Sequence, residues 1–490
     1  MLYRRLIEQH LNDERPLLYI DGNGITCKEI DAVCRNILDY FKTRGICAWS
    51  RILLVGECSR EVLLLMFACI AGGITFIILE ENTEKEKYEY IIQDCMPDAV
   101  YLAKTNSITF NTGRKAGQQV YVKHLLVRPD SLSTGQYLRR RRLIDSEQMV
   151  YLLYTSGSSG QAKGVIARIS QVLFCIDAIN KRLKNGKNDR FFSVLPLAFD
   201  YGLYQIFLAL ACGAQIYLKS HCKISEIPGE LKKNQITAFP GLPSLFRMLL
   251  KTRLLERVEL KELRYITSTG EVFPVSMIKK LEQLLPNTFI VPMYGLTECK
   301  RVSIMPLDKK IQCEKCGSCG LPLDGVRVWL RNADQQSRVG ELVVSGPNVM
   351  EGYWNDLKET QRYFELQKGE RILYTGDLFF IDQDGFLYFK GRKKQMLKIR
   401  GKRLSCVEIE QKIEQIPSVE ECVVFPVLKE EVEKAGVCIA VDVNAAPKEK
   451  EFWCTQIEKV CPEVKDYEIW IWKEKFPRNS HGKVDKVRIE

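Results

Sequence analysis

"YTSGSSGQAKGV", residues Tyr154–Val165, places three glycines, three serines, a threonine and one lysine behind the apolar run Met149–Leu153. Small residues allow a backbone to come close to a ligand, and hydroxyls with free N–H groups suit phosphate oxygens. Lys163 adds a single positive charge. This composition is that of a polyphosphate cradle, and an ordinary Gly/Ser turn is an equal alternative when the loop is taken alone.

The loop does not match a P-loop. That motif requires G-x-x-x-x-G-K-[ST], but Ala162 stands where the second glycine is needed and Gly164 follows the lysine. A P-loop also opens a helix, whereas "GVIARIS" after this loop predicts another short strand. We therefore expect a turn between two strands, and then a helix that begins near Ser170 as its N-cap. The apolar stripe of that helix is Val172, Ile176, Ile179 and Leu183.

The composition is that of a soluble globular protein, with 46% apolar and 27% charged residues in a chain of 490. This length is enough for more than one domain. Eighteen cysteines are scattered along the chain, and the N-terminal stretch lacks the apolar core of a signal peptide. The cysteines are therefore expected to be reduced thiols, and the protein to be cytoplasmic.

The stretch Val62–Leu79, "VLLLMFACIAGGITFIIL", carries no charge over eighteen residues and so imitates a membrane span. The pair Gly72-Gly73 divides it. We expect a buried helix that starts after Arg60-Glu61, followed by a buried strand, "ITFIIL". This is the pattern of a parallel sheet covered on both faces, so no membrane span is predicted.

The formal net charge is +11, and the run Arg139–Arg142 supplies four of the positive charges in a polar segment that predicts an exposed loop. No helix-turn-helix, zinc-finger or RNA-stacking pattern accompanies this run. A solvated face is therefore favoured, and no nucleic-acid partner is expected. An acidic protein partner would also suit such a surface.

Helical stripes alternate with short β-branched runs up to about residue 390, which is the rhythm of parallel sheets. Two later segments, "GELVVSGPNVMEGYW" (340–354) and "FFIDQDGFLYFKGRKKQ" (379–395), predict antiparallel strands, with Asp384-Gly385 as a hairpin turn. After Gly391 the sequence predicts a compact α+β segment of roughly 95 residues, the size of a small domain. The polar stretch "GRKKQ" is the expected hinge. The earlier strand-like runs are "RILLVG", "ITFIIL", "AQIYL" and "TFIVPM".

Four further stretches combine glycine, hydroxyl and charged residues: "MYGLTE" (Met293–Glu298), "YTGDLFF" (Tyr374–Phe380), "GRKKQMLKIRGKRLSCVEIE" (Gly391–Glu410) and "FPRNSHGKVDK" (Phe476–Lys486). Together with the opening loop, and in this order, they closely resemble the core motifs of the adenylate-forming (ANL) superfamily. That superfamily holds acyl-CoA synthetases, adenylation domains of nonribosomal peptide synthesis and luciferase-like enzymes. The resemblance runs from about residue 15 to the end and includes "GELVVSGPNVMEGYW".

The resemblance implies an α/β fold in two domains. A large N-terminal domain of αβ-layered sheets plus a distorted β-barrel would cover residues 1–393, and a small, mobile α+β lid would cover 394–490. It also implies an AMP-forming acid–thiol ligase that uses ATP and Mg²⁺, releases pyrophosphate and passes the acyl group to a thiol. Because a carboxylate attacking a polyanion is repelled, catalysis in such an enzyme is mainly orientation and charge neutralisation.

On this resemblance the nucleotide site has separate parts. Tyr294 would stack on adenine, Thr297 would touch the α-phosphate, and Glu298 would hold Mg²⁺ between phosphate oxygens. Asp377 would accept both ribose hydroxyls with its two oxygens, with Arg392 beside it. The other residues expected to bind ATP or AMP, several of them in the opening loop, are Thr155, Ser156, Gly157, Ser158, Ser159, Gly160, Lys163, Gly270, Glu271, Met293, Gly295 and Lys398.

Lys483 is the expected catalytic cation. The matching lysine of the family bridges the attacking carboxylate and the α-phosphate, and a unit charge about 4 Å away at an effective dielectric of about 20 is worth roughly 4 kcal/mol before desolvation. The alternative is a solvated lysine in a basic tail, since Lys486 and Arg488 follow. Lys394 is the expected hinge that moves Lys483 away and admits the thiol. Lys398 would face the thiol tunnel or a phosphate.

Two departures accompany the motifs. His481 replaces the asparagine usual before Gly482-Lys483, and Asn479-Ser480 replaces the usual threonine, yet the lysine is kept. The segment "CEKCGSCG" holds Cys313, Cys316 and Cys319 at spacings that suggest a metal or iron–sulfur site. It overlays the family's "GSxGxP" turn, however, and no fourth ligand with matching spacing is near, so a structural turn is favoured.

The stretch "LPLAFDYGLYQ" (195–205) corresponds to the acid-pocket entrance of the family. Asp200 stands where amino-acid-activating members pair an aspartate with the substrate's α-ammonium, which would offset the desolvation of a buried carboxylate. Capping of the following helix by Asp200 is an equal alternative. If Arg301 points inward, a substrate with a second acidic or carbonyl group becomes plausible. The predicted acid pocket comprises Phe199, Asp200, Tyr201, Tyr204, Pro240, Thr267, Thr269, Arg301 and Val302.

The acceptor thiol is expected to come from outside the chain, because only seven residues follow Lys483 and they leave no room for a carrier domain. The preferred interpretation is a free-standing ligase that charges the phosphopantetheine of a separate carrier protein with an amino acid or a similar small carboxylic acid. The alternative is an acyl-CoA synthetase that uses free coenzyme A.

Overall fold

The computed structural model describes two compact units of the chain. The first comprises Met1–Cys316, Gly320–Arg327 and Val344–Leu373, and the second comprises Gly317–Cys319, Val328–Val343 and Tyr374–Glu490. The predicted domain boundary at residue 393 stays a prediction. For Ser156 and Lys398 only the backbone is described. The described residues are 1–111, 117, 119–122, 125, 145–156, 161–393, 396–399, 402–429, 432–441, 449–462, 464, 467–472, 476–478, 484 and 488–489.

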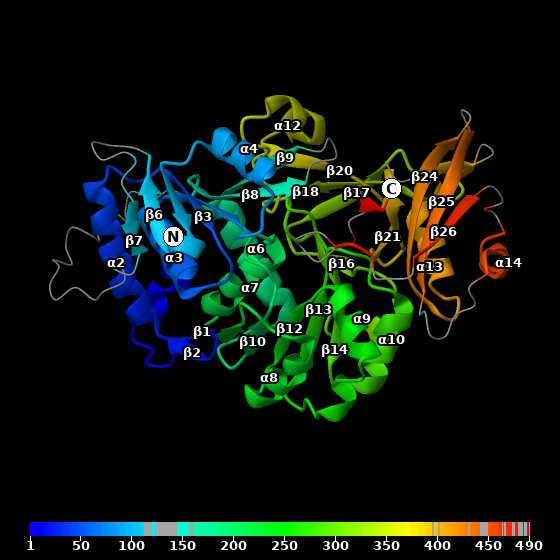
Figure 1. Ribbon diagram of the computed structural model, residues 1–490, viewed down its shortest axis with the longest axis horizontal. Coiled ribbons are helices and arrows are strands. Elements are labelled where there is room, and N and C mark those ends of the chain that lie inside the picture. Colours follow the sequence, from blue (N-terminus) through cyan, green and yellow to red (C-terminus); the bar gives the residue numbers. More distant parts are fainter. Residues whose placement is uncertain are drawn as a thin grey trace. The chain divides into compact units, whose positions relative to one another are not determined.

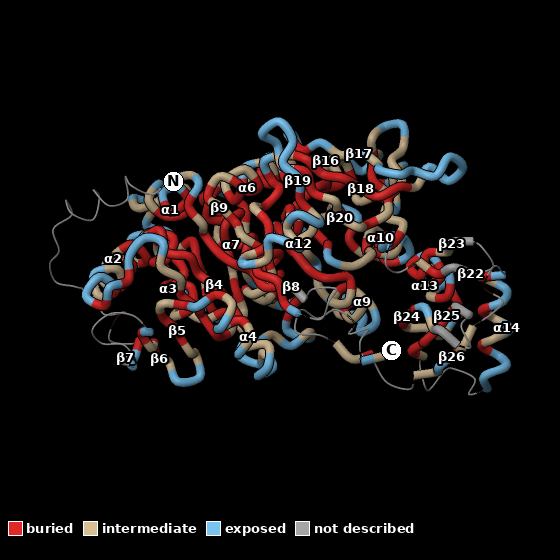
Figure 2. The backbone as a smooth tube through the Cα atoms, turned by 90° about the horizontal axis from the view of Figure 1, so that it is seen from above, coloured by how far each residue is buried: buried red, intermediate tan, exposed pale blue. Residues whose placement is uncertain are grey.

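The apolar stretch Val62–Leu79 divides at its glycines, as predicted. Helix α3 (Arg60–Gly72) begins after Ser59, whose hydroxyl accepts a hydrogen bond from the Val62 N–H, and it ends at Gly73 with φ +66°. Strand β4 (Thr75–Leu79) follows and is buried along its whole length. Both elements are coloured as buried in Figure 2. This hydrophobic stretch therefore belongs to the core of the first unit. Within the described parts of the chain, no helix has both the length and the apolar character to cross a membrane.

A seven-stranded sheet runs in the order β7-β6-β5-β3-β4-β8-β9 (Figure 1). The last two strands pair antiparallel, with Thr155 opposite Lys163, so the two strands predicted on either side of the opening loop are confirmed. The helix that follows is α6, whose N-cap is Arg168. The prediction that Ser170 caps this helix is wrong, because the backbone already turns helical one residue before it. The elements of this layer are α2 (Cys27–Thr43), β3 (Arg51–Val55), α4 (Lys85–Cys95), β5 (Ala99–Leu102), β6 (Ser107–Phe110), β7 (Gln119–Tyr121), β8 (Met149–Ser156), β9 (Ala162–Arg168) and α6 (Ile169–Leu183).

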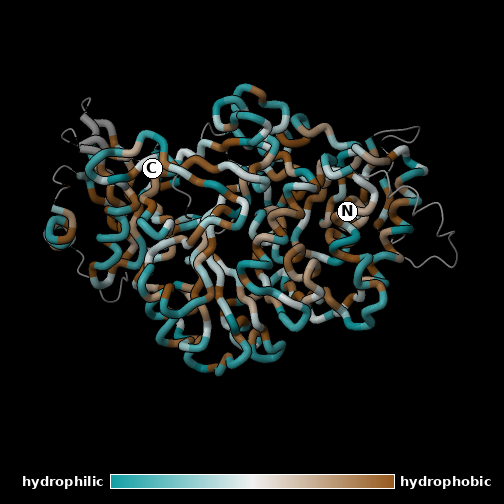
Figure 3. Tube along the Cα trace, turned by 180° about the vertical axis from the view of Figure 1, so that it is seen from behind, coloured by the Kyte–Doolittle hydropathy of each residue, from teal (hydrophilic) through white to brown (hydrophobic). Residues whose placement is uncertain are grey.

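A nine-stranded sheet runs in the order β16-β15-β14-β13-β12-β10-β11-β1-β2. The six strands β14, β13, β12, β10, β11 and β1 are parallel to one another. Apolar side chains of β10, β12 and the helices α8 to α10 form one core. In Figure 3, which is coloured by hydropathy, many loops at the edge of the view are teal, the colour of hydrophilic residues. The elements are α1 (Leu2–Leu6), β1 (Leu18–Ile20), β2 (Asn23–Ile25), β10 (Arg190–Ser193), α7 (Asp200–Ala211), β11 (Gln215–Leu218), α8 (Ile227–Lys233), β12 (Ala238–Gly241), α9 (Pro243–Lys251), β13 (Tyr265–Ser268), α10 (Val275–Leu284), β14 (Phe289–Tyr294), β15 (Ser303–Ile304), α11 (Lys309–Glu314) and β16 (Leu321–Pro322).

A five-stranded sheet has the order β17-β18-β20-β19, with β21 paired to β20. The predicted hairpin is confirmed: Ile381 pairs with Leu387 across the turn, and Gly385 has the φ of +85° that such a turn requires. The elements are β17 (Arg327–Arg331), β18 (Gly340–Ser345), α12 (Leu357–Tyr363), β19 (Phe364–Gln367), β20 (Glu370–Ile381) and β21 (Leu387–Arg392).

The C-terminal part of the second unit contains both helices and strands. A three-stranded sheet, β24-β25-β26, packs with α13 and α14 around the fully buried side chain of Trp453. A separate pair of strands, β22 and β23, precedes α13. The elements are β22 (Met396–Ile399), β23 (Lys402–Ser405), α13 (Cys406–Ile413), β24 (Val419–Lys429), β25 (Val432–Val441), α14 (Lys450–Val460) and β26 (Tyr467–Trp472).

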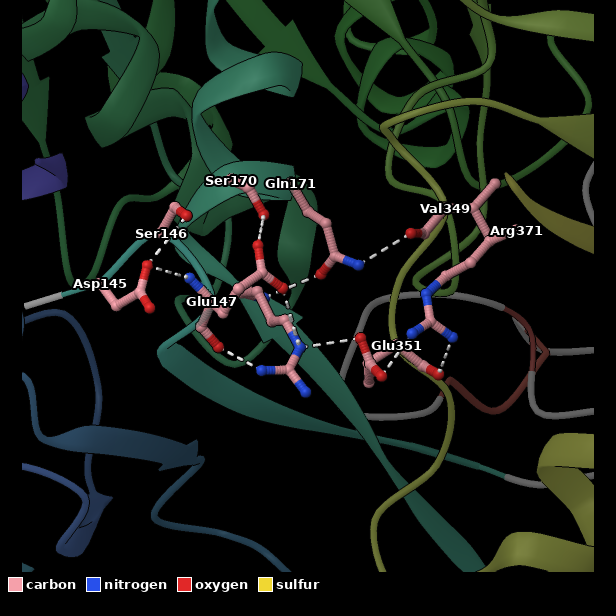
Figure 4. A network of polar contacts seen from close by, with 9 residues as sticks. Asp145, Ser146, Glu147, Ser170, Gln171, Val349, Glu351 and Arg371 are labelled. Carbon is pink, nitrogen blue, oxygen red and sulfur yellow. Dashed lines mark hydrogen bonds and ion pairs between the residues drawn. The ribbon is translucent and has the colours of Figure 1, made fainter. Parts of the chain in front are cut away.

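A polar network joins the start of α6 to the segment after β18 (Figure 4). The Glu351 carboxylate accepts hydrogen bonds from Arg168 Nε at 2.8 Å and from Arg371 Nη2. Arg371 also donates to the Glu351 carbonyl at 3.0 Å, and Gln171 donates to the Val349 carbonyl at 2.9 Å. One carboxylate thus connects two guanidinium groups from distant parts of the first unit.

We predict that Glu351→Gln lowers the free energy of unfolding by about 1–2 kcal/mol, because it leaves two partly buried guanidinium groups without their shared anion. The midpoint of urea unfolding, followed by tryptophan fluorescence, measures this change. Glu89→Gln is the matched control. Its partner Lys85 is 3.8 Å away and both side chains are exposed, so a shift below about 0.5 kcal/mol is expected. Equal shifts in the two variants would contradict the role given to Glu351.

Candidate nucleotide and acid site

The predicted phosphate-loop lysine is held by a partner that sequence reasoning missed. The Lys163 side chain is buried on β9, and its Nζ donates to the Glu359 carboxylate on α12. This hydrogen bond lowers the pKa of Glu359. Arg362 Nη1 donates to the other oxygen of Glu359 at 3.1 Å. In the sequence, Glu359 stands four positions before Tyr363, and an acidic residue at such a spacing is too common to indicate a partner for Lys163.

Tyr353 brings Lys163 and Glu298 together. The Lys163 Nζ lies 5.3 Å from the centre of the Tyr353 ring, and the Tyr353 hydroxyl donates to Glu298 Oε1 at 2.8 Å. Burial is the main cause that raises the pKa of Tyr353, and the adjacent Glu298 carboxylate adds to it, so the hydroxyl stays protonated and remains a donor. A cation and a carboxylate predicted for the same site therefore flank one aromatic ring in the first unit.

The "MYGLTE" segment leaves β14 through a close turn. Met293 and Tyr294 are the last two residues of that strand and are buried. A Cβ on Gly295 would lie 1.9 Å from the Lys300 carbonyl oxygen, so only glycine fits there. The Val302 N–H donates to the Tyr294 carbonyl at 2.9 Å and closes the loop. Thr297 and Glu298 lie in this loop and are partly exposed.

The remaining predicted nucleotide residues of the first unit lie at strand ends. Thr155 is at the end of β8, opposite Lys163. Gly270 follows β13 with φ +91°, and Glu271 is partly exposed beside it. Gly270 and Glu271 follow a parallel strand of the nine-stranded sheet, a usual ligand edge in such folds, whereas Thr155 lies in the antiparallel hairpin of the seven-stranded sheet.

In the second unit, Asp377 and Arg392 are paired, as the sequence predicts. They lie opposite each other on β20 and β21, and Arg392 Nε is 3.2 Å from Asp377 Oδ1. Asp377 is 3% exposed. The Thr375 hydroxyl accepts a hydrogen bond from the Asp377 N–H at 3.1 Å. The buried carboxylate of Asp377 is thus paired with the exposed guanidinium group of Arg392.

Asp200 does not cap α7. The N-cap is Phe199, and no side-chain cap hydrogen bond is made at this end, so the capping alternative is wrong. Asp200 is instead buried in the first turn, with Oδ2 at 3.9 Å from the Nζ of Lys300. Lys300 was not predicted. It follows the "MYGLTE" motif in the sequence, but nothing in its spacing indicated that it points inward.

Arg301 points inward, as the sequence analysis considered. Its guanidinium carbon lies 5.2 Å from the centre of the Tyr201 ring, and its Nη1 donates to the Thr269 hydroxyl at 2.9 Å. Tyr201 and Thr267 share a hydrogen bond of 2.6 Å. The other predicted residues of the acid pocket, Tyr204, Pro240 and Val302, are buried in the first unit, and Phe199 is partly buried.

The cysteine-rich segment begins in the last turn of α11 and continues through a turn at residues 315–317. Cys313 is exposed, and in the second unit the Cys319 N–H donates to the Leu387 carbonyl at 2.8 Å. The Ser318 hydroxyl donates to the same carbonyl at 2.9 Å. Burial raises the pKa of Cys319 to about 12, which opposes the thiolate that a metal needs. A search of the described residues finds no cluster of three metal-ligating side chains.

Several predicted residues lie outside the described residues, so their roles stay predictions. They include the catalytic Lys483 and the hinge Lys394. The side chains of Ser156 and Lys398 are also not described. The other predicted positions outside the described residues are Gly157, Ser158, Ser159 and Gly160.

Comparison with known proteins shows the family. The sequence profile of the "AMP-binding enzyme" family matches residues 7–354, so the chain belongs to this family of the adenylate-forming superfamily. Gramicidin S synthase 2 of Brevibacillus brevis is 25% identical over 480 residues, which are 96% of this chain and 10% of the synthase. The chain thus spans about a tenth of the length of that relative.

Solved structures match the fold over nearly the whole chain. ATP-bound MatB from Rhodopseudomonas palustris has a TM-score of 0.85 and 19% identity, covering 100% of this chain and 97% of MatB. O-succinylbenzoate coenzyme A synthetase (MenE) from Bacillus subtilis, in complex with ATP and magnesium, has a TM-score of 0.82 and 19% identity, covering 98% of both chains. The predicted α/β fold class of the superfamily is confirmed.

We predict that Gly295→Ala destabilises the first unit by about 1–3 kcal/mol and weakens ATP binding at least tenfold, because the added Cβ pushes the Tyr294–Glu298 loop away from the Lys300 carbonyl. Urea unfolding and isothermal titration calorimetry with ATP and Mg²⁺ measure the two effects. Gly229→Ala on α8 is the control, since nothing lies within 4 Å of its added Cβ. Unchanged ATP affinity in Gly295→Ala would remove this loop from the nucleotide site.

Proposed function

We propose that the protein is an ATP-dependent carboxylic acid ligase. It joins a small acid to AMP with release of pyrophosphate, and then transfers the acyl group to the phosphopantetheine thiol of a separate carrier protein. Family membership supports the first step. The observation that carries the proposal is the Tyr353 ring with Lys163 on its face and Glu298 on its hydroxyl.

The charges of this arrangement suit a polyphosphate with its metal. Lys163 would leave Glu359 to meet the β- and γ-phosphates, with Thr155 and the serines of the opening loop as further donors. Tyr353 occupies only Glu298 Oε1, and no described residue hydrogen-bonds the second oxygen. One free carboxylate oxygen is a suitable Mg²⁺ ligand, because Mg²⁺ prefers one or two carboxylates plus phosphates. When bound, the ion would neutralise phosphate charge.

The sugar and base would be held by other residues of the two units. Tyr294 would stack on adenine, with Gly270, Glu271 and Met293 around it. Asp377 would accept both ribose hydroxyls with the two oxygens of its buried carboxylate. Thr297 would touch the α-phosphate, where charge develops during attack.

The lid would supply the last cation. We assign Lys483 to the bridge between the attacking carboxylate and the α-phosphate, and Lys394 to the hinge that withdraws it. Lys398 would then face the thiol tunnel or a phosphate. One cleft can serve two reactions only if its cation leaves between them.

Lys483→Ala is predicted to lower adenylate formation at least 100-fold, while thioester formation from a supplied acyl-adenylate changes less than threefold. Acid-dependent ATP–pyrophosphate exchange measures the first half-reaction, and transfer of the acyl group from the adenylate measures the second. Lys486→Ala, three residues further on, is the control and should affect neither. Equal losses in both half-reactions would show that Lys483 does not act in the adenylation step alone.

The acceptor remains a choice between two thiols. The relatives matched along the chain include peptide synthases, which supports a carrier protein, whereas MenE is a coenzyme A synthetase, which supports free coenzyme A as the second candidate. The eighteen free cysteines support a reducing, cytoplasmic location.

The test of the proposal is pyrophosphate exchange over a panel of amino, aryl, hydroxy and short-chain acids, followed by thioester formation with coenzyme A and with phosphopantetheinylated carrier proteins in separate reactions. Acid-dependent exchange is expected, together with transfer to a carrier protein at least tenfold faster than to coenzyme A. Faster transfer to coenzyme A would support the second candidate. ATP consumption that no acid stimulates would overturn the ligase.

A further inference from the structure

Among the residues of the predicted acid pocket lies a buried lysine, Lys300, that belongs to none of the sequence motifs. The Lys300 side chain is 2% exposed, and its Nζ lies 3.9 Å from Asp200 Oδ2. The same Nζ lies 4.9 Å from the ring centre of Tyr151 and 5.6 Å from that of Tyr204. It makes no hydrogen bond to any described residue. Lys300 is therefore held by one carboxylate and two aromatic faces.

This cation changes what Asp200 can do. A buried carboxylate needs a positive partner, and in an amino-acid site the substrate's α-ammonium can supply it. Here Lys300 already supplies it. A second ammonium at Asp200 would be repelled by Lys300 and would also have to share the carboxylate. The Asp200–Lys300 pair therefore disfavours an α-amino acid.

Arg301 is the second buried cation, and it lacks an anion. Thr269 occupies its Nη1, and the guanidinium group stacks on Tyr201, but its Nε is buried without a hydrogen bond. In the part of the chain that the structure describes, no carboxylate lies within ion-pair distance of Arg301. Ser268, beside Thr269, also has a buried hydroxyl without a partner.

The buried charged side chains Asp200, Lys300 and Arg301 carry a sum of +1 when Lys300 is protonated. Glu298, the nearest further carboxylate along the chain, is partly exposed and held by Tyr353. Buried donors that find no partner in the protein are satisfied when a ligand provides an acceptor. A guanidinium group with free N–H donors is best matched by a planar carboxylate.

We infer that the preferred substrate is a small carboxylic acid with a second carboxylate and no α-ammonium. Arg301 binds the second carboxylate, and Lys300 takes the place of the substrate ammonium at Asp200. The inference rests on the proposed function, because the first carboxylate is the one that is adenylated. It narrows the substrate class from any small acid to dicarboxylic acids.

The experiment compares acids matched in length: malonate, succinate and glutarate against propionate, butyrate and pentanoate, and glutarate against L-glutamate. Pyrophosphate exchange gives kcat/KM for each acid. Calorimetric titration of the acids into the protein with a non-hydrolysable ATP analogue gives affinity without turnover. The best dicarboxylate is expected to exceed its monoacid and its amino analogue at least tenfold in both measurements.

Substitutions of Arg301 and of Lys300 separate the roles of the two cations. Arg301→Gln, which keeps a donor for Thr269, should lower the dicarboxylate-to-monoacid ratio of kcat/KM to near one, and Arg301→Lys should restore part of the ratio. Lys300→Met leaves Asp200 without its cation, so kcat/KM for L-amino acids should rise at least tenfold relative to the wild type. Lys300→Met with Asp200→Asn removes both charges and serves if the single variant does not fold. Arg338→Gln, an exposed arginine in the second unit, is the control.

The outcomes distinguish the two levels of the argument. A wild-type protein that prefers an L-amino acid or a monoacid would overturn this inference and leave the ligase intact. Absence of exchange with every acid would overturn the ligase, and the calorimetric comparison would still decide the inference. A preference for dicarboxylates that survives Arg301→Gln would overturn the role of Arg301.

Discussion

The placement of opposite charges around one tyrosine ring is the constraint on which the candidate nucleotide site of the first unit depends. Lys163 and Glu298 lie on elements that are far apart in sequence, and each would be repelled or desolvated if it were buried alone. Tyr353 stabilises both groups, because its ring face attracts the Lys163 ammonium and its hydroxyl donates a hydrogen bond to the Glu298 carboxylate. The segment that carries Tyr353 is fastened nearby by the Glu351 network. Packing of this segment and charge placement are therefore coupled.

Much of this fold could be predicted from local patterns. The charge-free stretch Val62–Leu79 divided at its glycines because a left-handed turn there needs Gly73. The hairpin around the opening loop followed from β-branched runs on either side. In contrast, the start of α6 could not be predicted from residue type alone. Ser170 is of a type that favours the N-cap, but the helix begins at Ile169. The N–H of the N-cap residue Arg168 donates a hydrogen bond to the side-chain oxygen of Gln171.

The candidate site could be predicted only where its residues belong to motifs. Asp377 and Arg392 were expected together, and the strand register pairs them. The sequence did not indicate Glu359 and Tyr353, because each contacts a residue that is distant in the sequence. It did not indicate Lys300 either, because no local pattern shows that this side chain is buried. Lys300 has a φ of +52°, an uncommon backbone for lysine, and its carbonyl oxygen lies against Gly295, where a Cβ would approach it to 1.9 Å.

The partner of Lys163 bears on how a nucleotide could enter. A polyphosphate that recruits Lys163 must compete with Glu359, and the partly buried carboxylate of Glu359 then loses its lysine partner. Arg362 already donates to its other oxygen at 3.1 Å, so Glu359 keeps a counterion after the lysine leaves. The lowered pKa of Glu359 shows that the ionised form is the one stabilised, mainly by Lys163. A phosphate can thus replace Glu359 at Lys163 without leaving the Glu359 carboxylate unpaired. A loop that binds and releases a nucleotide in each cycle requires such a reversible exchange.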